Sequence, residues 1–160
     1  MSESHELDLA AAHRHFAADC FNRAWSLIDQ STRTPEEAWE LVSLGHASLW
    51  HWTQRADCSE QNMSVGHWLL SRIYSVLGDP EPARRYAESC LAISQRAGLE
   101  PFYLGFAYEA VARAAAVAGD TATAVSALAA ARALAENVEG SDDLALLLAD
   151  LAEVERFDRG

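Results

Sequence analysis

Two similar segments lie 41 residues apart in the chain, Leu77-Gly-Asp-Pro-Glu-Pro-Ala83 and Ala118-Gly-Asp-Thr-Ala-Thr-Ala124. In both, an aspartate follows a glycine, and an alanine stands five positions after the glycine. Glycine readily adopts the left-handed conformation that ends many helices, and aspartate is a common cap for the next helix. An alanine side chain is small enough to let two helices approach closely. We therefore expect each segment to form the turn of an antiparallel helix pair.

Other helix start and stop signals follow on either side of these turns. Thr34-Pro-Glu-Glu37 combines a capping threonine, a proline at the first helical position and a glutamate that can complete a capping box. Ser141-Asp-Asp143 places a cap and two carboxylates at the start of a last helix. Valine, isoleucine and threonine never alternate over a long run, so no strand is expected. The sequence predicts an all-α fold of about seven helices, with pairs at about 6–56, 60–97 and 101–137 and a closing helix at 142–157.

The repeated turns resemble those of the tetratricopeptide repeat (TPR) family, in a longer form with about 40 residues per repeat. Thr34-Pro-Glu-Glu-Ala38 looks like a divergent third copy that lacks the glycine. The resemblance implies a single domain over residues 1–160, in which three antiparallel helix pairs stack as a right-handed solenoid. The last helix would cap the apolar face that has no following repeat. An ordinary helical bundle with recurrent Gly-Asp turns is the alternative.

The composition argues against several functional classes. The net charge is −12 and the chain has no lysine, so a phosphate backbone would be repelled and no binding to nucleic acid is expected. The lack of lysine also removes Schiff-base chemistry and the lysine of a phosphate-binding loop. No stretch approaches roughly 18 consecutive apolar residues, so no membrane span is expected. The acidic start MSESHELDL is unlike a secretory signal, which predicts a cytoplasmic protein, and alanine with arginine in place of lysine is typical of GC-rich bacteria.

The TPR resemblance also implies where a partner would bind. In that family the first helix of each pair lines a concave groove, and counting from the turns gives the inward positions. Each of these helices presents an aromatic residue followed by an arginine on the same face. Arginine beside an aromatic ring suits a carboxylate or phosphate that is attached to an apolar body. The predicted groove residues are Phe16, Arg23, Trp68, Arg72, Phe106, Glu109 and Arg113.

A purely structural role is the alternative for these arginines. Glu109 and Arg113 are spaced to pair along one helix, and Arg72 could meet an acidic neighbour. The lysines and asparagines of the chaperone-binding TPR clamp are not present at the corresponding positions. Binding to chaperone tails is therefore not expected.

All six histidines and all five tryptophans lie before residue 69, which raises a metal or small-molecule site as a second hypothesis. No two histidines have the i,i+3 or i,i+4 spacing that puts two ligands on one face of a helix. A metal site assembled from different helices by His13, His46 and His67 stays open. Trp39, His46 and Trp50 form one stripe of a helix, for which burial is expected.

The sequence therefore predicts a non-catalytic interaction module without a cofactor, which receives a peptide or protein segment with an acidic group in its groove. One alternative is a small-molecule or metal-binding protein, or an enzyme, that uses the histidine- and tryptophan-rich half. Another is a self-associating structural protein. The alanine-rich helix from Ala122 to Ala135 has flat faces that could pack against a second copy in a homodimer.

Overall fold

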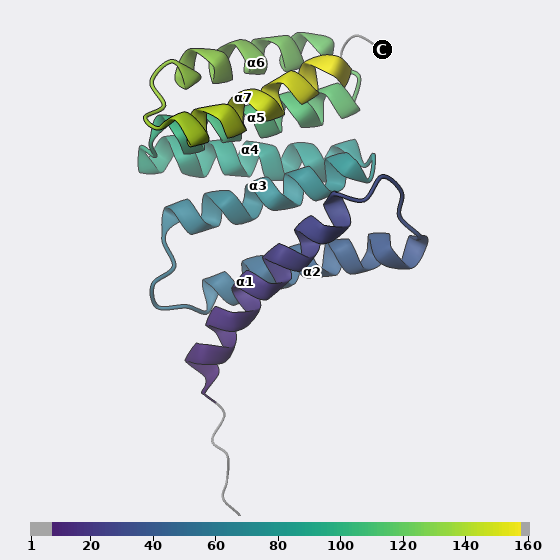
Figure 1. Ribbon diagram of the computed structural model, residues 1–160, viewed down its shortest axis with the longest axis vertical. Helices are drawn as coiled ribbons and strands as arrows, with labels where there is room; N and C mark the ends of the chain where they lie inside the picture. Colours follow the sequence, from purple (N-terminus) through teal and green to yellow (C-terminus); the bar gives the residue numbers. More distant parts are fainter. Residues whose placement is uncertain (1–7, 158–160) are drawn as a thin grey trace, which may run out of the picture. The chain divides into compact units, whose positions relative to one another are not determined.

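The computed structural model describes residues 8–157, and these residues form seven α-helices and no strand (Figure 1). The predicted all-α class is confirmed, and the predicted start of the first helix pair near residue 6 lies outside the described residues. No helix in this part of the chain is long and apolar enough to cross a membrane. The helices are α1 (Leu9–Ile28), α2 (Pro35–Thr53), α3 (Glu60–Val76), α4 (Pro80–Ala97), α5 (Pro101–Val117), α6 (Thr121–Ala135) and α7 (Ser141–Phe157).

Contacts within the chain divide it into two compact units, Met1–Cys58 and Ser59–Gly160. In the first unit, α1 packs against α2. In the second unit, α3 packs against α4, α5 packs against both of them, and α6 packs against α5. The residues for which a single domain was predicted thus comprise one compact unit of two helices and another of five.

The two repeated turns have the same backbone structure. Gly78 and Gly119 both adopt positive φ angles, of 73° and 74°, as expected for helix ends in the left-handed conformation. The next amide in each turn, from Asp79 or Asp120, donates to a carbonyl five residues earlier at 2.9 Å. The Asp120 side chain also caps α6 by accepting from the Thr123 amide, whereas Asp79 makes no such bond. The predicted repeat of the turn is confirmed.

The small residues after these turns let the paired helices approach closely. Ala83 and Ala124 are fully buried, and the Ser71 hydroxyl of α3 donates to the carbonyl of Ala83 in α4 at 2.9 Å. Within the Ser59–Gly160 unit, the α3/α4 and α5/α6 pairs therefore pack as neighbouring repeats of a helical solenoid. Their first helices, α3 and α5, lie next to each other.

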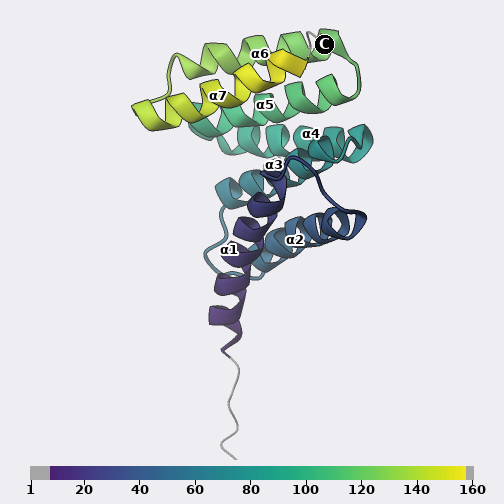
Figure 2. The same ribbon diagram turned by 45° about the vertical axis from the view of Figure 1, so that its right-hand side comes forward.

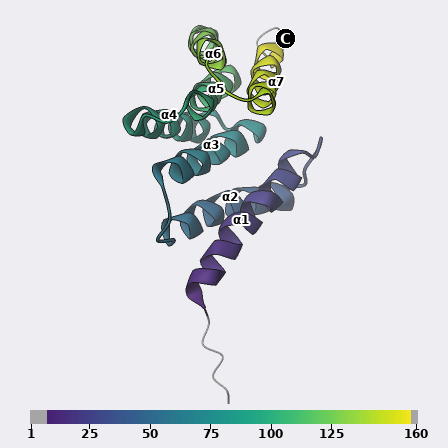
Figure 3. The same cartoon turned by 60° about the vertical axis from the view of Figure 1, so that its left-hand side comes forward.

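Helix α7 covers the last repeat. It packs on α5 and α6 (Figure 2), and Figure 3 shows α7 on one side of α5 and α4 on the other. Leu147, Leu151 and Val154 of α7 are fully buried in a cluster with alanines of α5 and α6. Full burial of such side chains contributes about 1.5–3 kcal/mol each. Gly105 makes room for this packing, since a Cβ atom there would lie 2.7 Å from a methyl carbon of Leu147.

The α1–α2 pair is held by its own buried contacts. Ala17 and Ala24 of α1 are fully buried, and the Ser48 hydroxyl of α2 donates to the Ala17 carbonyl at 2.8 Å. The Thr34 capping box forms as predicted, with both of its reciprocal bonds to Glu37.

The burial expected for the stripe of Trp39, His46 and Trp50 on α2 is wrong. Trp39 is 78% exposed and Trp50 is 55% exposed, and His46 is exposed as well. The buried face of α2 carries Leu41, Leu44 and Ser48 instead. Three aromatic residues at helical spacing indicate that they share a face, but the spacing does not tell whether a neighbour covers that face.

Candidate functional site

One face of the Ser59–Gly160 unit brings together five of the predicted groove residues. Successive turns of α3 and α5 place on it Val65, Trp68 and Arg72 from α3, and Phe102, Phe106, Glu109 and Arg113 from α5. We call this surface the α3/α5 face. The Trp68 and Phe106 rings meet edge to face, with their centroids 5.5 Å apart. The other two predicted groove residues, Phe16 and Arg23, belong to α1 in the Met1–Cys58 unit.

Glu109 is the centre of a buried polar cluster on this face. Its carboxylate is 1% exposed and accepts from the Arg113 Nε at 2.6 Å. It also accepts from the Trp68 indole nitrogen at 3.0 Å and from the Arg72 guanidinium at 3.4 Å. Three donors from two helices thus converge on one carboxylate, which satisfies a charge that would be costly to bury alone.

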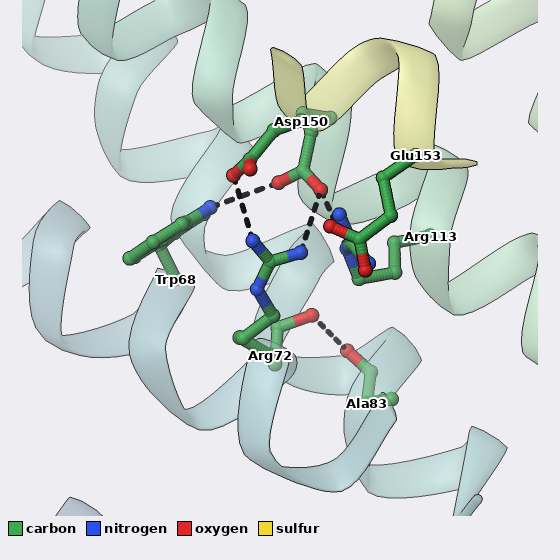
Figure 4. Close-up of polar contacts among 8 residues, drawn as sticks. Trp68, Arg72, Ala83, Arg113, Asp150 and Glu153 are labelled. Carbon is green, nitrogen blue, oxygen red and sulfur yellow. Dashed lines mark hydrogen bonds and ion pairs between the residues drawn. The ribbon is translucent and has the colours of Figure 1, made fainter. Parts of the chain in front are cut away.

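Helix α7 closes this cluster from above. Asp150 accepts from Arg72 at 2.7 Å, and Glu153 accepts from Arg113 at 3.1 Å. Figure 4 shows Arg72 and Arg113 pointing toward these two carboxylates. Arg72 is 6% exposed and Arg113 is 4% exposed. Two of the three predicted groove arginines, Arg72 and Arg113, are therefore buried and paired with acidic side chains of the same chain. We call these six residues, Trp68, Arg72, Glu109, Arg113, Asp150 and Glu153, the Glu109 cluster.

The charges of the Glu109 cluster do not cancel, because three carboxylates face two guanidiniums. Burial raises the pKa of Asp150 above its usual range even though Arg72 attracts its charged form. Burial also disfavours the charge of Arg113, but Glu109 and Glu153 outweigh it and raise the pKa of that guanidinium. Burial opposes the charge of Glu153 as well, but attraction to Arg113 and the hydrogen bond from it outweigh burial and lower the pKa of that carboxylate. Within the described residues, one Arg113 nitrogen, Nη2, has no hydrogen-bond partner.

The other half of the α3/α5 face, toward the start of both helices, is open. It contains a hollow of about 140 Å³ that is almost wholly apolar. Burial raises the pKa of the Cys90 thiol in its wall to about 11, so this thiol is protonated at neutral pH. We call this cavity the aromatic hollow, and it is lined by Ser64, Val65, Trp68, Cys90, Phe102, Tyr103 and Phe106.

A second pocket adjoins the aromatic hollow and shares two of its rings. It has a volume of about 310 Å³ and lies where α5 begins, α6 ends and α7 begins. Its wall includes three carboxylates and no cationic residue. We call it the acidic pocket, and its chief lining residues are Glu100, Phe102, Tyr103, Glu139 and Asp143.

The predicted groove residues of α1 have other partners. Arg23 pairs with Glu40 of α2 at 2.6 Å and approaches Asp19 at 3.8 Å, and all three side chains are substantially exposed. Phe16 is 44% exposed and its ring lies 5.4 Å from that of His51. An exposed ion pair of this kind contributes little to stability.

The histidines give no metal site in the described part of the chain, where no three histidine, cysteine or acidic side chains are grouped to hold an ion. His13 lies against His51, with their Nδ1 atoms 2.9 Å apart, so one ring donates and the other accepts. Burial and the neighbouring His13 lower the pKa of His51. His46 is on α2 of the same unit, and the half-buried His67 is on α3 of the other.

Comparison with known proteins found no match among protein-family models, curated proteins or solved structures. The fold and the geometry of the α3/α5 face are therefore the basis for assigning a function.

The sequence pattern missed the residues that decide which half of the face is open. Asp150 and Glu153 flank the buried Leu151 and Val154 of α7, and carboxylates at the edge of an apolar stripe are a signal that they meet cations across the interface. Tyr103 lies next to Phe102 in the first turns of α5, and this aromatic pair was a second available signal.

Proposed function

We propose that this protein is a non-catalytic interaction module of the TPR-like kind, which binds a peptide or protein segment on the α3/α5 face. The observation that carries this proposal is the aromatic hollow. Its three aromatic rings beside Trp68 leave an apolar cavity open to solvent, and such a cavity accepts one aliphatic or aromatic side chain of a partner.

The arrangement of α7 supports binding at the hollow and not at the arginines. An acidic partner on Arg72 and Arg113 would have to replace Asp150 and Glu153. It would also expose Leu147, Leu151 and Val154, at a cost of several kcal/mol. The hollow needs no such rearrangement, because α7 does not line it.

The chemistry of the α3/α5 face supports a non-catalytic role. Its charged groups hold one another in the Glu109 cluster, and the Cys90 thiol is protonated at neutral pH. A nucleophilic cysteine needs a lowered pKa and an electropositive surrounding. Cytoplasmic action is part of the proposal, in keeping with the burial of the unbridged Cys20 and Cys90 thiols.

Selection from a random peptide library displayed on phage tests the proposal. We expect peptides selected on the wild-type protein to lose binding to Val65→Asp, which places a charge in the wall of the hollow. Val125→Asp is the matched control, since Val125 is 54% exposed on α6 and does not line the hollow. Equal binding of the selected peptides to both variants, with both folded by circular dichroism, would rule out the hollow as the binding site.

A further inference from the structure

The acidic pocket owes its shape to three chain segments that meet beside the hollow. Pro101 starts α5, α6 ends at Ala135, and Gly140 turns the chain into α7 with a φ of 96°. Glu100, Glu139 and Asp143 come from these three segments and line one pocket. Carboxylates that are distant in sequence are thus gathered on one side of Phe102 and Tyr103.

No cationic side chain of residues 8–157 forms an ion pair with these carboxylates. None of the ion pairs of the described residues includes Glu100, Glu139 or Asp143, and no arginine lines the pocket. This contrasts with Asp150 and Glu153, whose charges meet arginines. The acidic pocket therefore leaves an unmatched negative charge at the edge of the aromatic hollow, on a chain that is strongly acidic overall.

The chemistry of the pocket favours an organic cation over a metal ion. No three of the described carboxylates converge closely enough to hold a metal ion. A cavity of about 310 Å³ has room for a guanidinium or ammonium group. Aromatic rings beside carboxylates suit such groups, through cation–π contact with the ring face and hydrogen bonds to the acid.

We propose that the occupant of the aromatic hollow is a basic protein segment, in which an apolar side chain fills the hollow and a neighbouring arginine or lysine enters the acidic pocket. The two cavities share Phe102 and Tyr103, so both side chains can come from adjacent positions of one short segment. This inference rests on the proposed function and changes the chemistry of the expected partner, because the arginines that suggested an acidic partner are already occupied by α7.

Four synthetic peptides of equal length, with blocked ends, test this inference by isothermal titration calorimetry. Three have a central leucine flanked by arginines, by glutamines or by glutamates, and the fourth has arginine flanks around a central serine. We expect the arginine–leucine peptide to bind tightest, with the glutamine–leucine peptide about five- to tenfold weaker. The glutamate–leucine and arginine–serine peptides should be weaker still.

A pair of double variants locates the cation. Glu139→Gln with Asp143→Asn should weaken the arginine–leucine peptide about five- to tenfold and leave the glutamine–leucine peptide unchanged. Glu81→Gln with Glu88→Gln removes the same net charge from residues that line neither cavity. This control should weaken the arginine–leucine peptide much less and should also leave the glutamine–leucine peptide unchanged.

Equal effects of the two double variants would overturn the inference, as would equal binding of the arginine–leucine and arginine–serine peptides. So would phage-selected peptides that require Val65 but carry acidic flanks, and this result would leave the proposed function standing. If instead none of the selected peptides depended on Val65, the proposed function itself would be contradicted.

Discussion

Near their ends, α3 and α5 carry Arg72, Glu109 and Arg113 beneath α7, whereas near their starts they carry Val65 and Phe102 around an open hollow. The same two helices thus present charged residues where α7 covers them and apolar residues around a hollow that α7 does not line. Surface patterns usually have the opposite order, with charge outside and apolar groups inside. The difference indicates that the arginines fasten α7, and that the uncovered apolar half is the part of the face available to a partner.

The largest effect is expected at the centre of the closed half. Glu109→Gln removes the charge that two buried arginines share and turns an amide donor toward groups that are themselves donors. Breaking a buried ion pair in this way costs about 3–5 kcal/mol. Urea denaturation should show this loss, while Glu88→Gln, at an exposed pair with Arg84, should change stability far less. Equal losses for the two variants would mean that the Glu109 cluster does not hold the face together.

The packing of α7 can be tested by the effect of Gly105→Ala on stability, which should change sign between the wild type and the Leu147→Ala variant. Gly105→Ala in the wild type crowds Leu147, and overpacking of about 1–3 kcal/mol should exceed the roughly 1 kcal/mol gained in helix propensity. Leu147→Ala alone should destabilise by about 2–5 kcal/mol. In that background Gly105→Ala should become stabilising by about 1 kcal/mol, because the crowding is gone. Additive effects in the four-protein cycle would show that α7 does not sit on Gly105.

A smaller effect is expected at Asp150. Asparagine can still accept from Arg72, and burial already disfavours the aspartate charge, so Asp150→Asn should change stability by less than about 1 kcal/mol near neutral pH. The raised pKa of Asp150 means that its contribution to stability is present below its usual pKa and is lost as pH rises through the folded value. Asparagine does not titrate and so does not lose stability in this way. The free energy of unfolding of Asp150→Asn, measured by urea denaturation, should therefore rise relative to that of the wild type as pH rises through that window. If the wild type instead became more stable relative to Asp150→Asn as pH rises, the raised pKa of Asp150 would be contradicted.

The fold was largely predictable from the sequence, and the site only in part. Gly78 and Gly119 end their helices with positive φ angles, which glycine adopts readily. This preference is local, so the sequence alone could predict it. Helical spacing likewise placed Arg72 and Trp68 on one face. The same spacing could not tell what covers that face, because Asp150 is 78 residues from Arg72 and Glu153 is 40 from Arg113. The prediction that Trp39 is buried was wrong for the same reason. Tertiary packing, and not local periodicity, decides which face of a helix is covered by a neighbour.

The division of the α3/α5 face is tested most directly by amide hydrogen exchange of α7 in the protein saturated with the arginine–leucine peptide. If the peptide binds at the hollow, α7 should keep its protection, and the Trp68 indole proton should stay as slow to exchange as in the unbound protein because Glu109 still accepts it. Loss of protection throughout α7 on binding would show that the partner takes its place on Arg72 and Arg113, and would contradict the assignment of the arginines to a structural role.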